Sequence, residues 1–386
     1  MDQMNKYGHY RVGDKKIFST ASAFIESRRT GQKIEFYYHN KVFAYADKGK
    51  IERLSLSDLY RERAQQLRDT YDYLSLQYSG GSDSNNVLMT FLKNDIKLDQ
   101  VVVRIPKAIV DSGLHRPNIN DTSATNLLSE WEYTIKPDLE YLAKYHPQIE
   151  ISIIDWLDNP VEKISERCFE ESIGTLYLTF RLRHPIFSQN TRELEMLSKG
   201  KKVGIIYGVD KPDVVIKAGT KSAYFTMNDK HIRHHAATID NPLGTEYFYF
   251  SPAVPEIPHK MAHEIFNWFK LNPMFADYLY PSKMRGSYTM RFQFLNSISK
   301  RIVYPYWDVT RFQVQKNNLV HNRGRGVTES DLLVYKSGAL DTAINKWNYL
   351  VSSYYKEMDQ ESLLRGETFP PIPSRYYYLG ELDELQ

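Results

Sequence analysis

Short apolar runs alternate with stretches of helical periodicity between residues 71 and 207, and this alternation constrains the fold more than any other feature. Strands are expected at 71–78, 100–105, 149–154 and 202–207. Helices are expected around 87–92, over 123–145 with a break at Pro137, around 161–180 and over 191–198. Strands that alternate with helices are typical of a parallel sheet covered on both faces. We therefore expect an α/β fold with a doubly wound parallel sheet.

A ligand site is expected in the loops that follow the carboxyl ends of these strands. Right-handed crossovers bring the carboxyl ends of all parallel strands to one edge of the sheet. In open sheets of this kind, ligands bind beyond that edge. The glycine-bearing loops after Tyr78 and Tyr207 are both expected there.

Three regions are expected along the chain: a small N-terminal cap over 1–54, the α/β domain over 55–213 and a mixed region over 214–386. The α/β domain is predicted to open with a helix capped by Ser55, with Asp58 three residues on, as in a capping box. Beyond residue 213 we expect a hairpin at 214–217 and 223–226, a strand at 247–250, and helices at 259–270 and 332–354.

Composition narrows the class of protein. The chain has 386 residues, a formal net charge of +3 and one cysteine, Cys168, which excludes a disulfide scaffold and a four-thiolate zinc site. Its 29 tyrosines are expected at core edges and interfaces, because tyrosine joins apolar area to a polar tip. No apolar run approaches the ~20 residues of a membrane span, and no signal peptide is recognised. A cytoplasmic protein without a membrane partner is therefore expected.

The loop at 79–84, with the sequence Ser-Gly-Gly-Ser-Asp-Ser, has the chemistry of a phosphate site. It follows an expected strand and opens an expected helix, whose first N–H groups and partial positive charge favour an anion. Gly80 and Gly81 let the backbone approach that anion closely. Hydroxyl donors come from Ser79, Ser82 and Ser84. Asp83 fits such a loop if a divalent cation lies between its carboxylate and the phosphates.

This loop resembles the signature of the PP-loop ATP pyrophosphatases, in the adenine nucleotide alpha hydrolase-like (HUP) superfamily. The family pattern Ser-Gly-Gly-x-Asp-Ser matches at all five fixed positions, and the resemblance covers roughly 56–213. The Gly-Lys-Ser/Thr of a Walker A loop is missing. The resemblance implies that residues Ser79, Gly80, Gly81, Ser82, Asp83 and Ser84 bind ATP with Mg²⁺. It also implies cleavage between the α and β phosphates, which gives AMP and pyrophosphate.

Three further residues receive roles from the same resemblance. Asp210 would share the magnesium with Asp83, and Lys211 would bind the nucleotide and neutralise charge on the departing pyrophosphate. Arg104, near the end of the second expected strand, would lie beside the adenine. Asp83 and Lys211 are thus the expected catalytic residues. An exposed turn that happens to hold Asp210 and Lys211 remains an alternative, as does a purely structural Arg104.

The missing cysteines narrow the reaction that the resemblance implies. Thiolating members use paired cysteines, sulfonucleotide reductases use one catalytic cysteine, and the deazapurine nitrile synthases carry a four-cysteine zinc site. The asparagine synthetase type begins with a nucleophilic cysteine, whereas residue 2 here is Asp2. An AMP-forming ligase that adenylates a substrate oxygen and then transfers nitrogen fits best. The alternatives are a tRNA-modifying ligase of the lysidine type and a nucleotide-binding protein without catalysis.

The acceptor of the adenylyl group is not identified by the sequence. The pairing of the 79–84 loop with Gly-Val-Asp-Lys-Pro at 208–212 is similar to uncharacterised phage-encoded PP-loop proteins. That likeness implies the host cytoplasm and a role in modifying a nucleotide or a nucleic acid during infection. A small-molecule acceptor is the other alternative. Related enzymes are often dimers, so a homodimer is one expectation.

Overall fold

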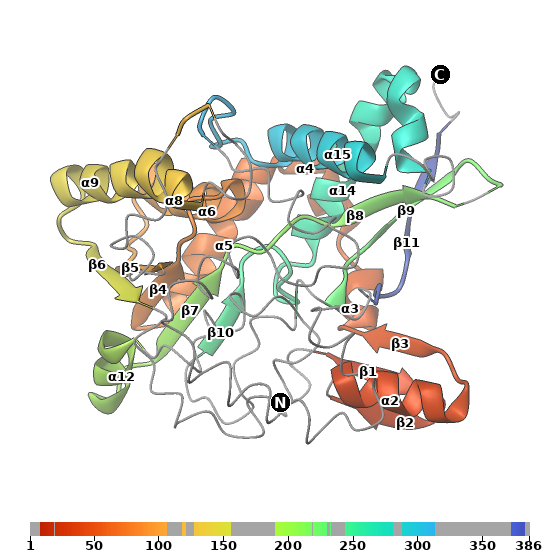
Figure 1. Ribbon diagram of the computed structural model, residues 1–386, viewed down its shortest axis with the longest axis horizontal. Helices are drawn as coiled ribbons and strands as arrows, with labels where there is room; N and C mark the ends of the chain where they lie inside the picture. Colours follow the sequence, from red (N-terminus) through yellow and green to blue (C-terminus); the bar gives the residue numbers. More distant parts are fainter. Residues whose placement is uncertain are drawn as a thin grey trace.

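The computed structural model in Figure 1 describes residues 8–18, 20–105, 118–120, 127–155, 190–217, 219–229, 232, 244–280, 288–312 and 372–382. Three sheets organise these residues. The helices expected at 161–180 and 332–354, and Cys168, lie outside them. Among the described helices, none combines the length and the apolar character that crossing a bilayer requires.

The central sheet has five strands in the order β10-β7-β4-β5-β6, and every neighbouring pair is parallel. Its strands are β4 (Tyr73–Gln77), β5 (Gln100–Ile105), β6 (Glu150–Asp155), β7 (Val203–Tyr207) and β10 (Gly244–Tyr247). They lie side by side from β6 to β10 across Figure 1. The strands predicted between residues 71 and 207 agree with β4 to β7, which confirms an α/β fold with a parallel sheet.

The order of the strands creates a switch point in the middle of this sheet. From β4 the chain passes outward to β5 and β6, and it then returns to β7 and β10 on the other side of β4. The direction therefore changes between β4 and β7, where open α/β sheets bind ligands beyond the carboxyl ends of the strands. Because β10 lies beyond residue 213, the sheet extends past the 55–213 range expected from the sequence. The strand expected at 247–250 is shifted to this position.

One face of the central sheet is apolar and is covered by α5 (Leu56–Thr70) and α6 (Ser82–Lys93). Leu74, Leu76 and Ile206 are fully buried on this face. α5 begins with the predicted capping box: Ser55 Oγ accepts from the Asp58 N–H at 3.1 Å, and Asp58 Oδ2 accepts from the Ser55 N–H at 3.2 Å. These two bonds satisfy donors that a helix end otherwise leaves unpaired.

A buried ion pair ties α5 to the edge strand β10. Arg63, only 2% exposed, donates to Glu246 Oε2 at 2.8 Å and to the Tyr247 carbonyl at 3.1 Å. The Tyr71 hydroxyl donates to the other Glu246 oxygen at 2.5 Å. The Tyr71 ring fits because Gly204 has no side chain, since a Cβ there would lie 2.7 Å from the ring. The fifth strand is therefore held by charge as well as by the backbone ladder.

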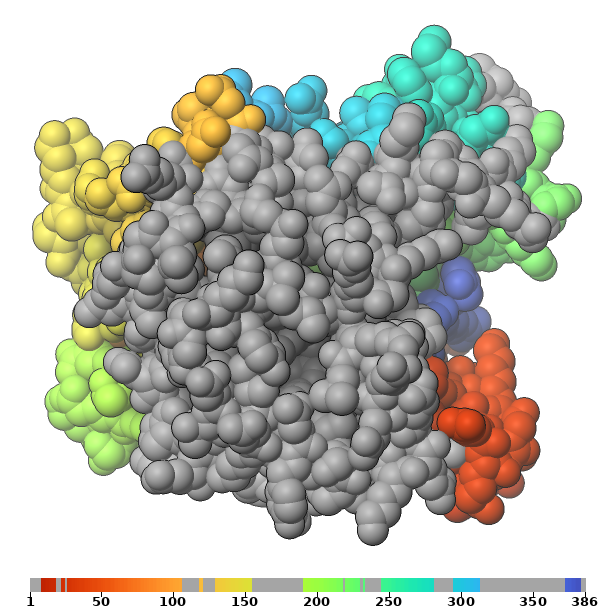
Figure 2. Space-filling model, in the orientation of Figure 1, coloured from red at the N-terminus to blue at the C-terminus, as the bar shows by residue number. Residues whose placement is uncertain are grey.

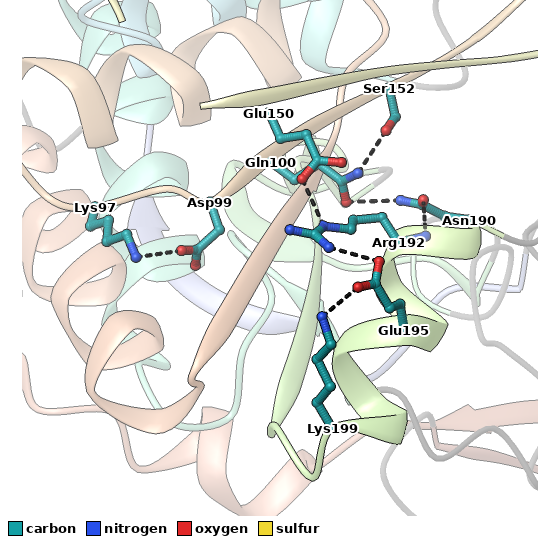
Figure 3. Close-up of polar contacts among 9 residues, drawn as sticks. All are labelled: Lys97, Asp99, Gln100, Glu150, Ser152, Asn190, Arg192, Glu195 and Lys199. Carbon is teal, nitrogen blue, oxygen red and sulfur yellow. Dashed lines mark hydrogen bonds and ion pairs between the residues drawn. The ribbon is translucent and has the colours of Figure 1, made fainter. Parts of the chain in front are cut away.

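The opposite face of the sheet carries polar side chains and is covered in part by α12 (Thr191–Ser198), which matches its predicted range. Figure 3 shows how this helix meets the strands. Asn190, its N-cap residue, donates to Gln100 Oε1 at 2.8 Å, and Gln100 donates to Ser152 Oγ at 2.7 Å. Arg192 Nε donates to Glu150 Oε2 at 2.8 Å. The polar residues of β5 and β6 thus satisfy one another through α12.

Glu193 is the buried carboxyl group at the centre of this polar face. It is 1% exposed and accepts hydrogen bonds from Ser75 Oγ and, at 3.2 Å, from Gln77 Nε2. Burial raises the pKa of Glu193, while the bond from Ser75 and the positive charge of Arg104 act in the opposite direction. The sequence pattern predicted Ser75 and Gln77 only as strand residues, whereas the structure joins them to Glu193 in one hydrogen-bonded network.

The helix before β6 does not break at Pro137. α8 (Leu127–Glu130) continues through a π turn, η1 (Trp131–Ile135), into α9 (Lys136–Tyr145). Pro137 lies in the first turn of α9, directly after the π turn. The π turn also carries Thr134 and Ile135, which contact the loop described below.

Two antiparallel sheets of three strands flank the central one. The N-terminal sheet contains β1 (His9–Val12), β2 (Lys15–Ile17) and β3 (Ile34–Tyr37). In the sequence, α2 (Thr20–Thr30) lies between β2 and β3, and α3 (Asn40–Ala44) and α4 (Lys48–Arg53) follow β3. It forms the margin at the lower right of Figure 2. The predicted hairpin is present as β8 (Asp213–Ile216) and β9 (Ser222–Thr226), and β11 (Tyr377–Glu381) pairs with β9.

Helices from beyond residue 244 link the flanking sheets to the central one. They are α14 (Glu256–Leu271), η3 (Pro273–Leu279) and α15 (Tyr288–Val303). α14 covers the range predicted as helix and packs against α4, α5, α15 and the hairpin. His259 on α14 lies at this junction, with its Nε2 2.6 Å from the Phe43 carbonyl and its ring 4.6 Å from that of Phe225.

We expect His259 to make folding stability depend on pH. Burial lowers its pKa from 6.5 to about 4, although the bond to Phe43 opposes that shift. The unfolded chain therefore binds the proton more tightly, so stability is complete above pH 6.5 and falls as the pH drops from 6.5 towards 4. The loss should reach about 2–3 kcal/mol, as measured by urea denaturation across this range.

The variant His259→Gln provides the control for this effect. It removes the titrating ring, so its stability should change much less between pH 6.5 and 4, with a remainder from His263, whose pKa burial also lowers. Equal slopes for the variant and the unaltered protein would contradict this assignment.

Candidate functional site

The loop at 79–84 leaves β4 at the switch point and turns sharply into α6. The Tyr78 N–H donates to the Val102 carbonyl at 2.8 Å, so the chain stays in the sheet up to the loop. Gly80 then takes a φ of +74°, in the left-handed region that favours glycine. A Cβ on Gly80 would also lie 2.6 Å from Ile135 Cγ1 in the π turn. Backbone conformation and packing both require glycine here.

Serine hydroxyls close the loop on itself. The Ser79 N–H donates to Ser84 Oγ at 3.2 Å, and Ser84 Oγ donates to the Gly81 carbonyl at 3.2 Å. The hydroxyls of Ser79 and Ser84 also lie 3.2 Å apart. These contacts hold the turn in place before α6 begins, so the start of the helix has a defined direction.

The first turn of α6 carries polar atoms that have no partner among the described residues. Gly81 is the N-cap residue, and no side chain caps the helix. Ser82 Oγ and Asp83 Oδ1 are both buried without a hydrogen bond to any described group. Unpaired N–H groups and a free hydroxyl suit an anion, while a free carboxylate oxygen suits a cation. This combination fits a phosphate that arrives together with a divalent cation.

The loop after β7 touches this turn directly. A Cβ on Gly208 would lie 2.9 Å from the Asp83 carbonyl oxygen and 3.0 Å from Ser84 Cα. Both are backbone atoms, which have little freedom to move aside. The close approach therefore requires glycine, and it places the residues after Gly208 beside the first turn of α6.

Lys211 lies in that second loop and is oriented by two acceptors. Its Nζ donates to Asp210 Oδ1 at 2.9 Å and to Asn296 Oδ1, on α15, at 2.6 Å. Burial lowers the pKa of Lys211, but the negative charges of Asp210 and then Asp83 outweigh that effect and raise it. Asp83, Asp210 and Lys211 are thus brought within electrostatic range of one another, and Lys211 stays charged.

Three buried tyrosines stand behind Asp83, on the side of the C-terminal helices. The Tyr249 hydroxyl donates to the Asp83 carbonyl at 2.8 Å and accepts from Asn86 Nδ2 at 3.0 Å. The rings of Tyr60 and Tyr304 lie 5.5 and 5.4 Å from that of Tyr249. The sequence did not mark Tyr304 or Asn296 as site residues, because their distance from the loop along the chain leaves no local pattern to detect.

A second polar cluster holds the other side of the loop. The Tyr78 hydroxyl donates to Asp138 Oδ2 and accepts from Asn85 Nδ2 at 3.1 Å. Arg311 also binds Asp138 Oδ2. Burial raises the pKa of Tyr78, and the charge of Asp138 adds to that shift. The cluster joins β4, α6, α9 and the segment after α15, so the loop is held from two sides.

Arg104 lies elsewhere on the sheet. The strand register puts it on the polar face with Gln77, and its charge acts on Glu193. Asp83 lies on α6, which covers the opposite, apolar face. The predicted role of Arg104 beside the adenine stays a prediction.

The carboxylates near the loop suit magnesium better than a metal that needs a full protein cage. Among the described residues, no three His, Cys, Asp or Glu side chains are placed to share a metal ion. The negative charges of Asp83 and Asp210 both act on the Tyr304 hydroxyl and on the Lys211 ammonium group. Mg²⁺ is commonly held by one or two carboxylates together with substrate phosphates and water.

Among known proteins, no protein-family model, no curated protein and no solved structure matches the chain.

We expect Gly208→Ala to separate the two loops. The added methyl group would clash with backbone atoms of Asp83 and Ser84, so the variant should lose about 1–3 kcal/mol in urea denaturation. Gly49→Ala is the control, because a Cβ in that helical position meets only Asp47 Oδ1 at 3.4 Å and should not destabilise the protein. Equal stability of the Gly208→Ala variant and the unaltered protein would contradict the close approach.

Proposed function

We propose that this protein binds ATP with Mg²⁺ at the 79–84 loop and splits it between the α and β phosphates, as a PP-loop ATP pyrophosphatase of the HUP superfamily. One observation carries the proposal. The Ser-Gly-Gly-Ser-Asp-Ser loop lies at the switch point between β4 and β7, where it meets a loop that holds a charged lysine. The sequence pattern and the topology of the sheet both support a site at this edge.

In this proposal the first turn of α6 binds the phosphates. The N–H groups of Ser82, Asp83 and Ser84 and the free Ser82 hydroxyl are the donors. Asp83 and Asp210 hold the divalent cation, and bound Mg²⁺ supplies positive charge that offsets the charge of the phosphates. Gly208 keeps the two loops close enough for one ligand to reach both.

Lys211 acts on the leaving group. A substrate oxygen attacks the α-phosphorus, the bond from that phosphorus to the bridging oxygen breaks, and pyrophosphate departs with the bonding electrons. Asp210 and Asn296 hold the Lys211 ammonium in place, so its charge is already oriented when the negative charge develops. Such preorganised charges supply much of the rate enhancement in reactions of this kind.

The second half-reaction gives the proposal its ligase character. A nitrogen nucleophile attacks the activated carbon of the adenylate, and the bond from that carbon to the AMP oxygen breaks. The acceptor is a small molecule, a nucleotide or a nucleic acid. A tRNA-modifying ligase of the lysidine type would give an adenylated RNA intermediate, whereas a protein without catalysis would give no product.

We expect α-labelled ATP, Mg²⁺ and a cell extract to give labelled AMP, pyrophosphate and an adenylated acceptor that mass spectrometry identifies. Lys211→Met should lower the rate about 10²–10³-fold, as the loss of a charge that stabilises the transition state does, while ATP still binds. Asp83→Asn should weaken Mg²⁺-dependent binding. A product pattern of ADP and phosphate alone would exclude this chemistry.

Lys260→Met is the matched control for Lys211→Met. Lys260 is also mostly shielded from solvent and forms an ion pair at 3.0 Å, with Glu264 on the same helix, but it lies on α14. Its replacement should leave AMP formation unchanged. A similar loss of rate in both variants would show that the effect comes from folding.

A further inference from the structure

The segment that ends α15 and continues to residue 312 contacts the candidate site at several points. Asn296 accepts from Lys211 Nζ at 2.6 Å. The Tyr306 N–H donates to Asn86 Oδ1, on α6, at 3.4 Å. The Thr134 hydroxyl, in the π turn beside Gly80, donates to the Phe312 carbonyl at 3.0 Å. Tyr304 lies within this segment, so its position is fixed by contacts on both sides.

Tyr304 is held rigidly by its backbone and its ring. The residue is 1% exposed. Its N–H donates to the Lys300 carbonyl at 3.1 Å, and its own carbonyl accepts from the Trp307 N–H at 3.0 Å. The ring lies 5.4 Å from that of Tyr249, whose hydroxyl is bound to the Asp83 carbonyl. The tyrosine therefore has a fixed direction relative to Asp83.

The Tyr304 hydroxyl and Asp83 Oδ1 are both buried, and neither makes a hydrogen bond of standard distance and angle to another described group. The Asp83 carboxylate nevertheless lies close enough to the Tyr304 hydroxyl to act on its pKa as a hydrogen-bond acceptor. A buried polar group without a well-formed hydrogen bond destabilises the folded state, so such groups call for an explanation. One is a donor and the other an acceptor, which makes them complementary.

The charges around the Tyr304 hydroxyl are those of the candidate metal ligands. Burial raises the pKa of Tyr304 well above its usual value, and the next cause is the negative charge of Asp83, with a smaller contribution from Asp210. A phenol hydroxyl beside two carboxylates is a hydrogen-bond donor among acceptors.

We propose that Tyr304 is a positioning residue for Asp83: its hydroxyl donates to the Asp83 carboxylate and orients it towards the divalent cation that accompanies ATP. The proposal rests on the proposed function. One carboxylate oxygen takes the phenol proton as a hydrogen bond, and the other is free to bind the cation. The C-terminal region thereby supplies a part of the cation site that the 79–84 loop lacks.

Two other buried tyrosines serve as comparison positions that distinguish this role from a contribution to core packing alone. The Tyr60 hydroxyl already donates to the Val303 carbonyl at 2.7 Å, so its removal affects folding. The Tyr377 hydroxyl is buried without a described partner, like that of Tyr304, but it lies on β11 beside His259 and Phe225. Tyr377→Phe therefore makes the same chemical change away from Asp83.

The test measures Mn²⁺ binding by electron paramagnetic resonance in the presence of α,β-methylene ATP, which cannot be split between the α and β phosphates. We expect Tyr304→Phe to weaken Mn²⁺ binding about tenfold, as the loss of a hydrogen bond to a charged group does. The affinity for the nucleotide without cation should not change. Tyr377→Phe should leave both affinities unchanged, and Tyr60→Phe should lower the melting temperature.

The outcomes distinguish this inference from the function on which it rests. Equal Mn²⁺ affinity in Tyr304→Phe and the unaltered protein would overturn the role of Tyr304 alone. The same loss in Tyr377→Phe would also overturn it, since packing would then explain the effect. If the unaltered protein binds neither the nucleotide nor Mn²⁺ with it, the ATP proposal fails, and this inference fails with it.

Discussion

The contact between Gly208 and the first turn of α6 is the constraint on which the rest of the candidate site depends. Two parallel strands normally diverge at their ends into separate loops, but here one backbone lies directly against the other. Only a residue without a side chain permits this distance. Because of it, a carboxylate from one loop and a lysine from the other lie in the same buried region. The low dielectric there strengthens their electrostatic interactions.

Helices, strands and caps that depend on interactions between residues close in the sequence were predicted correctly from local patterns. The capping box at Ser55, strand β5 and helix α12 all lie where the sequence indicates, because caps and periodicity act over a few residues. Pro137 was predicted wrongly as a break, since the π turn before it moved the proline into a first turn. The 79–84 loop was found from its motif, whereas Asn296 and Tyr304 reach it through packing that no short pattern encodes.

The two faces of the central sheet differ in polarity and in what they contribute to the fold. The face under α5 and α6 is apolar and supplies the hydrophobic core behind the loop. The other face buries Ser75 and Glu193, which is costly unless these polar groups have partners. The network through α12 provides those partners and ties the helix to strands β4, β5 and β6. A sheet held in this way presents its loops at a constant distance, as a site built from two loops requires.

The position of α15 also bears on the order in which the molecule matures during synthesis. The 79–84 loop leaves the ribosome long before Asn296, which orients Lys211. β10 and its partner Arg63 are likewise separated by 183 residues. Domains generally fold as units and from the N-terminal end during synthesis, but this site joins early and late parts of the chain. A nascent chain that lacks residues 288–312 contains the 79–84 loop but not Asn296, which accepts from Lys211 Nζ. The arrangement around Lys211 is therefore completed only late in synthesis.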